Sequence, residues 1–233
     1  MTRVAALLFD KDGTLFDFAA TWESWARAFL LRLCEGDVPA AAALGALIGY
    51  DLHQRRFARD SVVIAGTPDQ IAAILHPHVP GLDLPSLLTI LNEEARKAPQ
   101  RQAVPLVPLL TDLRARGLKL GVATNDAEVP ARAHLDAAGV TALFDFVAGS
   151  DSGYGGKPAP GQMLAFAGQV DVAPEACVMI GDSTHDLHAG RAAGMRCVGV
   201  LTGLAQAEDL AHLADVVLSD IAQLPDWLDS LDP

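Results

Sequence analysis

Residues 4–14 read VAALLFDKDGT, an unbroken apolar run that stops at Asp10-Lys11-Asp12 and is followed by a glycine. Such a run is typical of a strand with both faces buried, as in a parallel sheet. Gly13 lets the chain turn sharply directly after the strand. The stretch therefore predicts a central strand of an α/β sheet that presents two nearby carboxylates at its carboxyl end.

Four further apolar runs also end in polar turns. They lie at Leu118–Ala123, Phe144–Ala148, Ala176–Ile180 and Cys197–Leu201. Between residues 105 and 205 these runs alternate with segments of helical spacing, namely Val107–Arg116, Pro130–Ala138, Pro160–Gly168 and Asp186–Ala193. Alternating strands and helices predict a doubly wound, Rossmann-like α/β domain with a parallel sheet.

Residues 16–95 have a different pattern. They contain helix-like segments and no run that predicts a strand: Ala19–Cys34, Ala40–Tyr50, Pro68–Leu75 and Pro85–Lys97. Since the first strand needs the later ones to complete its sheet, we expect a core of residues 1–16 and 100–233 with a helical cap domain, residues 17–99, inserted into it. We also expect the cap to open and close about linkers near Phe16–Ala20 and Lys97–Val104, to admit substrate and then exclude water.

Composition narrows the classes of function. The 233 residues are 51% hydrophobic and carry a formal net charge of -12, which supports a large core and argues against non-specific binding to nucleic acid or an anionic membrane. Cys34, Cys177 and Cys197 show no CxxC spacing, so free thiols in a reducing compartment are expected. With no candidate signal peptide or membrane span, the chain is expected to be cytoplasmic, as a monomer or homodimer.

The polar turns are expected to meet in space, because open parallel sheets bind ligands beyond the carboxyl ends of their strands. Asp10 and Asp12 can act as nucleophile and general acid/base. Thr124-Asn125 can donate hydrogen bonds to a phosphoryl group, and Lys157, before Pro158, can offset clustered negative charge. In the turn GDSTHD, residues 181–186, two carboxylates four residues apart can bind or orient a hard divalent cation.

These motifs, DKDGT, TN, KP and GDSTHD in that order, resemble the four motifs of the haloacid dehalogenase-like hydrolases. The resemblance covers nearly the whole chain, with the helical insertion where that superfamily has its cap. Within the superfamily the chain looks like the phosphoglycolate phosphatase-like branch. The resemblance implies a Mg2+-dependent phosphatase that acts on a small phosphorylated metabolite, phosphoglycolate among the candidates, through an aspartyl-phosphate.

The resemblance also implies a role for each matching residue. Asp10 would attack phosphorus, and Asp12 would protonate the leaving oxygen and later deprotonate the attacking water. Mg2+ would bind the Asp10 carboxylate, the Asp12 backbone carbonyl and Asp182, with Asp186 binding the metal or orienting a metal-bound water. The substrate phosphate would be bound by Thr124, the Asn125 backbone amide and Lys157, and Lys157 would also neutralise Asp10.

Four alternatives to a phosphatase exist on such a fold. Dehalogenases and phosphonatases of the superfamily lack the second aspartate, so Asp12 favours phosphoryl transfer. A phosphomutase of the β-phosphoglucomutase kind shares all four motifs, and the core does not separate it from a phosphatase. A non-catalytic binding protein on this fold is disfavoured by the intact set of Asp10, Asp12, Lys157 and Asp182.

Other noticeable residues have simpler interpretations. Ser183 is expected to cap a helix, and His185 and His188 are expected on a helix surface, since the oxygen-rich neighbours favour a hard cation over zinc. Aromatic residues at helical spacing are expected in the cap core or at its seam with the sheet domain: Trp22, Trp25 and Phe29. The basic run His53, Arg55 and Arg56 is expected on the surface, and Lys11 is equally consistent with a structural role and a cap-facing one.

Overall fold

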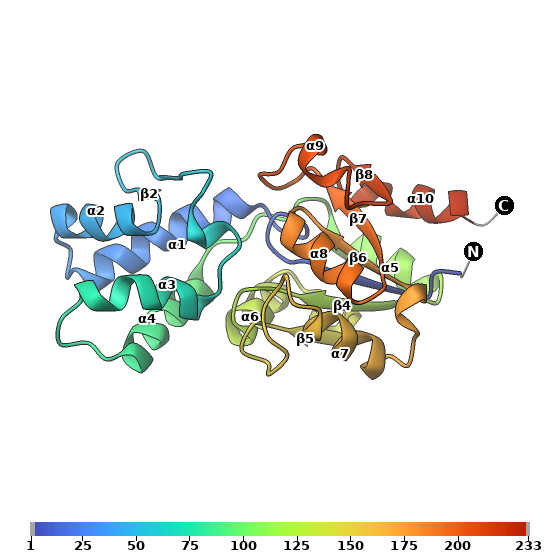
Figure 1. Cartoon of the computed structure of the whole chain (residues 1–233), viewed down its shortest axis with the longest axis horizontal. Coiled ribbons are helices and arrows are strands. Elements are labelled where there is room, and N and C mark those ends of the chain that lie inside the picture. The colour runs from blue at the N-terminus through green and yellow to red at the C-terminus, as the bar shows by residue number, and fades with distance from the viewer. Residues whose placement is uncertain (1–2, 232–233) are drawn as a thin grey trace.

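The computed structural model describes residues 3–231. Its main sheet is parallel, with strand order β5-β4-β1-β6-β7-β8 (Figure 1). The strand β1 (Ala6–Phe9) lies between β4 (Lys119–Ala123) and β6 (Cys177–Gly181), so that Leu8 is in register with Gly121 and Met179. The outer strands are β5 (Phe146–Ala148), β7 (Arg196–Val200) and β8 (Val216–Leu218).

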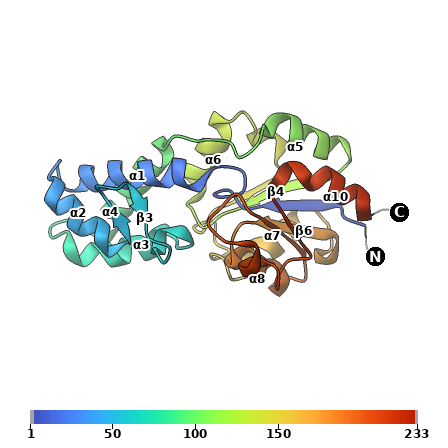
Figure 2. The ribbon, with the colours of Figure 1, turned by 90° about the horizontal axis from the view of Figure 1, so that it is seen from above.

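Helices cover both faces of the sheet, because alternate residues of β1 point to opposite sides. Leu7 and Phe9 pack in one apolar cluster with α5 (Leu106–Ala115), α6 (Glu128–Ala137) and α10 (Leu224–Leu231). Ala6 and Leu8 pack in another with α7 (Gly161–Gln169), α8 (Thr184–Ala192) and α9 (Ala207–Leu210). Figure 2 shows the two layers on either side of the sheet. The predicted doubly wound core is confirmed.

Short 3-10 turns complete the connections of the core. They are η3 (Thr141–Leu143), η4 (Pro174–Ala176) and η5 (Ile221–Gln223). The strand β8 and helices α9 and α10 extend the core beyond the region in which the sequence predicts strands. Cys34, Cys177 and Cys197 are free, the last two buried and the first half-buried, as expected.

The helices inserted between β1 and α5 form the expected cap with an apolar cluster of its own. They are α1 (Phe18–Leu33), α2 (Val38–Leu47), α3 (Pro68–Leu75) and α4 (Leu84–Lys97), with 3-10 turns η1 (Val62–Ile64) and η2 (His76–His78). Figure 1 shows this helical layer beside the sheet domain. Trp25 and Phe29 lie in the cap cluster, as expected. The exact boundaries of residues 17–99 stay a prediction.

The expectation of no strand in this insertion is wrong. A short antiparallel hairpin pairs β2 (Tyr50–Asp51) with β3 (Arg56–Phe57). The Asp51 carboxylate accepts hydrogen bonds from the backbone N–H groups of His53 and Gln54 and so stabilises the turn. Two-residue strands are too short to produce an alternating pattern, which explains the error.

The two chain segments that connect cap and core run side by side. The Asp17 N–H donates to the Arg101 carbonyl at 2.8 Å, and the Ala103 N–H donates to the Leu15 carbonyl at 2.9 Å. An Asp17–Arg101 ion pair reinforces this contact. Within residues 3–231, none of the helices combines the length and the apolar character that crossing a membrane requires.

Candidate active site

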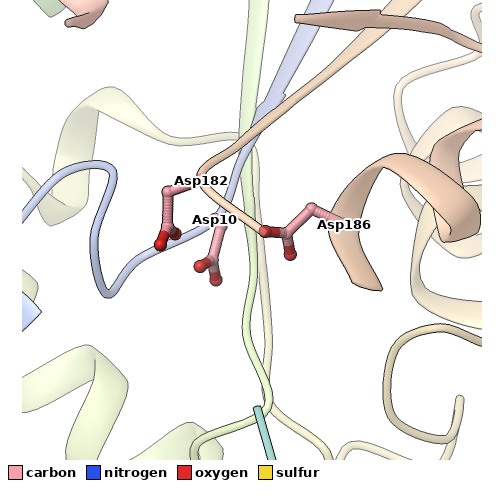
Figure 3. A group of neighbouring side chains, drawn as sticks. All are labelled: Asp10, Asp182 and Asp186. Carbon is pink, nitrogen blue, oxygen red and sulfur yellow. The ribbon is translucent and has the colours of Figure 1, made fainter. Parts of the chain in front are cut away.

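Three buried carboxylates meet at the carboxyl end of the sheet. Asp10 follows β1, Asp182 follows β6, and Asp186 lies in the first turn of α8. Each contributes a carboxylate oxygen to a group whose members lie within 4.8 Å of one another. Figure 3 shows the three side chains around one small space. The predicted convergence of these turns is therefore present in the structure.

Lys157 is the cation that contacts this group. Its Nζ lies 2.6 Å from Asp10 Oδ1 and 2.6 Å from Asp186 Oδ1, and it donates to the Ala123 carbonyl at 3.0 Å. Burial, partly offset by Lys157 and reinforced by Asp186, raises the pKa of Asp10 to about 7. Burial alone would lower the pKa of Lys157, but the two carboxylates outweigh it and hold that pKa above its usual value.

The cluster of Asp10, Asp182 and Asp186 suits a divalent cation. When all three carboxyl groups are ionised, they and the one ammonium leave two negative charges uncompensated, and burial together with the Asp186 and Asp10 charges raises the pKa of Asp182 well above its usual value. Carboxylate oxygens are the ligands that Mg2+ prefers. Gly13 and Gly203 both pack so closely on the Asp182 carboxylate that a Cβ on either would overlap it. The residues present thus fit Mg2+ in both charge and chemistry.

Asp186 has a second function in the fold. Its Oδ2 accepts a hydrogen bond from the Ser183 N–H at 3.0 Å, and the Ser183 Oγ accepts one from the Asp186 N–H at 3.4 Å, which together form a capping box at the start of α8. The Ser183 Oγ also donates to Asp186 Oδ2 at 2.7 Å. The expectation that Ser183 caps a helix is confirmed. Because Asp186 Oδ1 contacts Lys157 at the same time, Asp186 connects the start of α8 to the cluster of three carboxylates.

Asn125 connects three segments of the chain. Its Nδ2 donates to the Ala65 carbonyl of the cap at 2.7 Å and to the Lys157 carbonyl at 3.0 Å, while its Oδ1 accepts from the Lys157 N–H at 2.8 Å. The side chain is therefore occupied by protein contacts. A phosphate contact through its backbone amide, as predicted, is compatible with this arrangement. The neighbouring Thr124 is buried, and its Oγ1 accepts from the Asp126 N–H at 3.1 Å.

Lys11 lies under the site in a buried polar cluster. Its Nζ is 2.7 Å from Asp12 Oδ2, 3.3 Å from Asp126 Oδ2 and 3.0 Å from His134 Nδ1. Because an ammonium group only donates, His134 Nδ1 must accept, and Nε2 then donates to the cap carbonyl of Ala95 at 2.8 Å. Burial and the Lys11 charge lower the pKa of His134 to about 4, which fits this neutral form.

This cluster gives Lys11 a structural role, with Asp12 as its direct partner, and the Lys11 Nζ also lies 5.3 Å from the centroid of the Trp22 ring, so that Lys11 faces the cap as well. The contribution of Asp126 and His134 was not recognised from the sequence. His134 lies 123 residues from Lys11 along the chain, and no motif spacing connects the two. Only the chain fold brings them together.

One cavity, partly open to solvent, lies between cap and core. All seven predicted site residues line it: Asp10, Asp12, Thr124, Asn125, Lys157, Asp182 and Asp186. Trp22, Trp25 and half-buried His185 line it too. His188 is exposed on α8, and His53, Arg55 and Arg56 are exposed on the β2–β3 hairpin, as expected. For His185 the surface interpretation missed its position beside the site.

An acidic, lysine-containing site beyond the ends of parallel strands, under a helical cap, defines a Rossmann-like α/β enzyme whose site suits phosphoryl groups. Residues 4–194 match the family model described as haloacid dehalogenase-like hydrolase. The chain therefore belongs to the haloacid dehalogenase-like hydrolase family, as the sequence motifs indicated.

Several curated relatives carry phosphatase names, and others are named as tyrosine-protein kinase PtkA of mycobacteria. Phosphoglycolate phosphatase of Rhodospirillum rubrum is 39% identical over 121 residues, which cover 52% of this chain and 50% of that protein. The Escherichia coli protein of the same name is 34% identical over 48% of this chain and 45% of its own length. The chain thus matches about half the length of these relatives. "Probable phosphatase IndB" of Dickeya dadantii is 29% identical over 92% of this chain and 88% of its own.

Solved structures share the fold across both cap and core. CbbY from Rhodobacter sphaeroides in complex with phosphate has a TM-score of 0.67 at 23% identity, covering 95% of this chain and 96% of that one. β-Phosphoglucomutase from Clostridium difficile has a TM-score of 0.64 at 18% identity and covers 98% of each chain. At these identities the likeness concerns the fold alone.

Proposed function

We propose that this chain is a Mg2+-dependent phosphomonoesterase that acts through an aspartyl-phosphate on Asp10. The observation that carries the proposal is the buried group of Asp10, Asp182 and Asp186 with Lys157 in contact with the first and third. The family and the names of the relatives support it. Those names also make phosphoglycolate the first substrate to test.

Asp10 is the proposed nucleophile. A carboxylate that attacks a phosphate dianion is repelled by it, and Lys157, at 2.6 Å from Asp10 Oδ1, reduces this repulsion. The Asp10 and Asp182 carboxylates and the Asp12 backbone carbonyl would hold Mg2+, with Asp186 in contact with it directly or through water. When bound, Mg2+ supplies positive charge to the transferring phosphoryl oxygens.

Asp12 is the proposed general acid/base. Asp12 lines the cavity together with Asp10, and Lys11 contacts both carboxylate oxygens of Asp12. In the first half-reaction Asp12 gives its proton to the leaving oxygen, and in the second it takes a proton from the water that hydrolyses the phosphorylated Asp10. Thr124 and the Asn125 backbone amide would bind the phosphoryl oxygens.

The test is phosphate release from a panel of phosphomonoesters, with Mg2+ and with EDTA. We expect metal-dependent turnover by the wild type and none by Asp10→Asn, which keeps the shape of the side chain and removes the nucleophile. Asp136→Asn is the matched control, because Asp136 is exposed on α6 away from the cavity. Turnover that survives in Asp10→Asn would refute the covalent mechanism, and bisphosphate-dependent isomerisation without phosphate release would identify a mutase instead.

A further inference from the structure

The cavity has two chemically different walls. The core contributes the carboxylates, Lys157 and the Thr124–Asn125 turn. The cap contributes an apolar wall whose side chains come from α1, the η1 loop, α3 and α4: Phe18, Trp22, Trp25, Val63, Ile64, Ala65, Pro68, Ile71 and Leu91. A substrate whose phosphate lies on the core side therefore places the rest of the molecule against the cap wall.

The aromatic part of this wall consists of two indole rings, and the N–H group of one of them, Trp25, is engaged within the cap. Trp22 and Trp25 pack edge to face with ring centroids 5.3 Å apart, and the Trp25 Nε1 already donates to the Leu91 carbonyl at 3.2 Å. The Ala65 carbonyl on this wall already accepts a hydrogen bond from Asn125 Nδ2. Such a surface favours contact with apolar groups.

Positive charge is missing from the cap wall. Among the described residues that line the cavity, the basic ones are Lys157, already between two carboxylates, and His185, on the core side at the start of α8. None of the cap's described arginines is among the residues that line the cavity. Arg32 pairs with Glu93 and Glu94 on the outer surface, and Arg55 and Arg56 are exposed on the hairpin.

A second anionic group on the substrate would therefore lack a partner on the cap wall, since the basic residues of the lining, Lys157 and His185, lie on the core side. A carboxylate or second phosphate in the leaving portion would lose its water against apolar side chains and lie in the field of the core aspartates. This argues against phosphoglycolate and against bisphosphates, whatever the names of the relatives. It does not disfavour an uncharged apolar alcohol, for which burial is favourable.

Building on the proposed phosphatase function, we propose that the physiological substrate is the monophosphate ester of an uncharged, largely apolar alcohol, with an aromatic or branched aliphatic group bound between the Trp22–Trp25 pair and the η1 loop. The phosphate is its only ionised group. Phosphoglycolate and phosphorylated carboxylic acids are consequently poor substrates.

Binding tests this inference separately from turnover. Benzylphosphonate and 4-carboxybenzylphosphonate have the same phosphonate and the same ring, and differ in one carboxylate; neither can be hydrolysed. Titration calorimetry with wild type and Mg2+ is expected to give at least about 100-fold tighter binding of the uncharged compound, as is usual when a charge is buried without a partner. Equal affinities, or tighter binding of the carboxylate, would overturn the inference.

Turnover of the matching esters separates the two proposals. Benzyl phosphate and 4-carboxybenzyl phosphate have leaving alcohols of similar reactivity, so their kcat/KM ratio reports on the pocket. A high ratio supports the inference. A ratio near one, with turnover still lost in Asp10→Asn, leaves the phosphatase proposal intact and overturns the substrate class. Binding that follows the expected preference without any turnover would overturn the phosphatase proposal alone.

A charge introduced into the cap wall gives a gain-of-function test. Ile64 is half-buried in η1 and lines the cavity, so a lysine there can extend toward the substrate without entering the cap core. Ile64→Lys is expected to lower the benzyl to 4-carboxybenzyl preference at least 10-fold, and Ile64→Met, of similar length and uncharged, is expected to keep it. An unchanged preference in a folded Ile64→Lys protein would count against the apolar wall as the source of selectivity.

Discussion

Replacing Lys11 with methionine should destabilise the fold strongly. The Lys11 side chain is fully buried and contacts Asp12, Asp126 and His134. Methionine has nearly the same length but leaves the buried Asp126 carboxylate without its cation, and breaking a buried ion pair in this way costs about 3–5 kcal/mol. Asp12 is more exposed, so water can solvate its carboxylate once the ammonium is gone.

The destabilisation should depend on pH. Burial, only partly offset by Lys11, raises the pKa of Asp126 to about 6 in the folded protein, above its value in the unfolded chain. A carboxyl group with a raised folded pKa lowers stability as pH rises through that range, and loss of Lys11 raises this pKa further. The free energy lost in Lys11→Met should therefore be largest at pH 8 and smaller at pH 5, where Asp126 takes up a proton.

Urea unfolding at the two pH values measures the effect. Adding Asp126→Asn to Lys11→Met removes the unpaired charge and should recover much of the loss. Lys119→Met is the matched control, because Lys119 is half-exposed and 3.6 Å from Asp145, a surface pair expected to contribute below about 1 kcal/mol. A loss in Lys11→Met no larger than in the control, or a loss independent of pH, would refute the assignment of Lys11 and Asp126 as a buried ion pair.

Three further outcomes are expected. Asp12→Asn should lower kcat by about 10²–10⁴-fold with little change in Mg2+ affinity, measured by steady-state kinetics and metal titration; an unchanged kcat would remove Asp12 from acid/base catalysis. Gly203→Ala should weaken Mg2+ binding in calorimetry, because its Cβ overlaps the Asp182 carboxylate, whereas Gly168→Ala, at an open position, should not. Asn125→Ala should speed hydrogen exchange of the η1 loop, since it removes the bond to the Ala65 carbonyl; unchanged exchange there would show that the loop is held by other contacts.

The catalytic half of the core could be predicted from the sequence because its signals are local. Each central strand is a short apolar run that ends in a polar turn, and the register of β1 with β4 and β6 places those turns side by side. The strand β8 gave a weaker signal, since Val216–Leu218 has only three residues and all are half-buried.

The parts that escaped prediction depend on contacts distant in sequence. His134 reaches Lys11 across 123 residues and Asn125 reaches Ala65 across 60, and neither contact leaves a periodic pattern. The apolar cap wall also had no readable motif, because α1, η1, α3 and α4 each contribute one or a few side chains to it. Substrate preference is therefore a property of the folded cap, whereas the chemistry of the core is visible in its turns.

The pairing of the two linkers bears on how such enzymes diversify. Phe16 bridges to Gln102, so the insertion leaves and re-enters the core at neighbouring points. The cap also buries its apolar residues in a cluster distinct from the two that line the sheet. A gene segment that encodes another helical module with closely spaced ends could replace this one while the strand register stays intact. Evolution could thus change what the enzyme selects without rebuilding how it reacts.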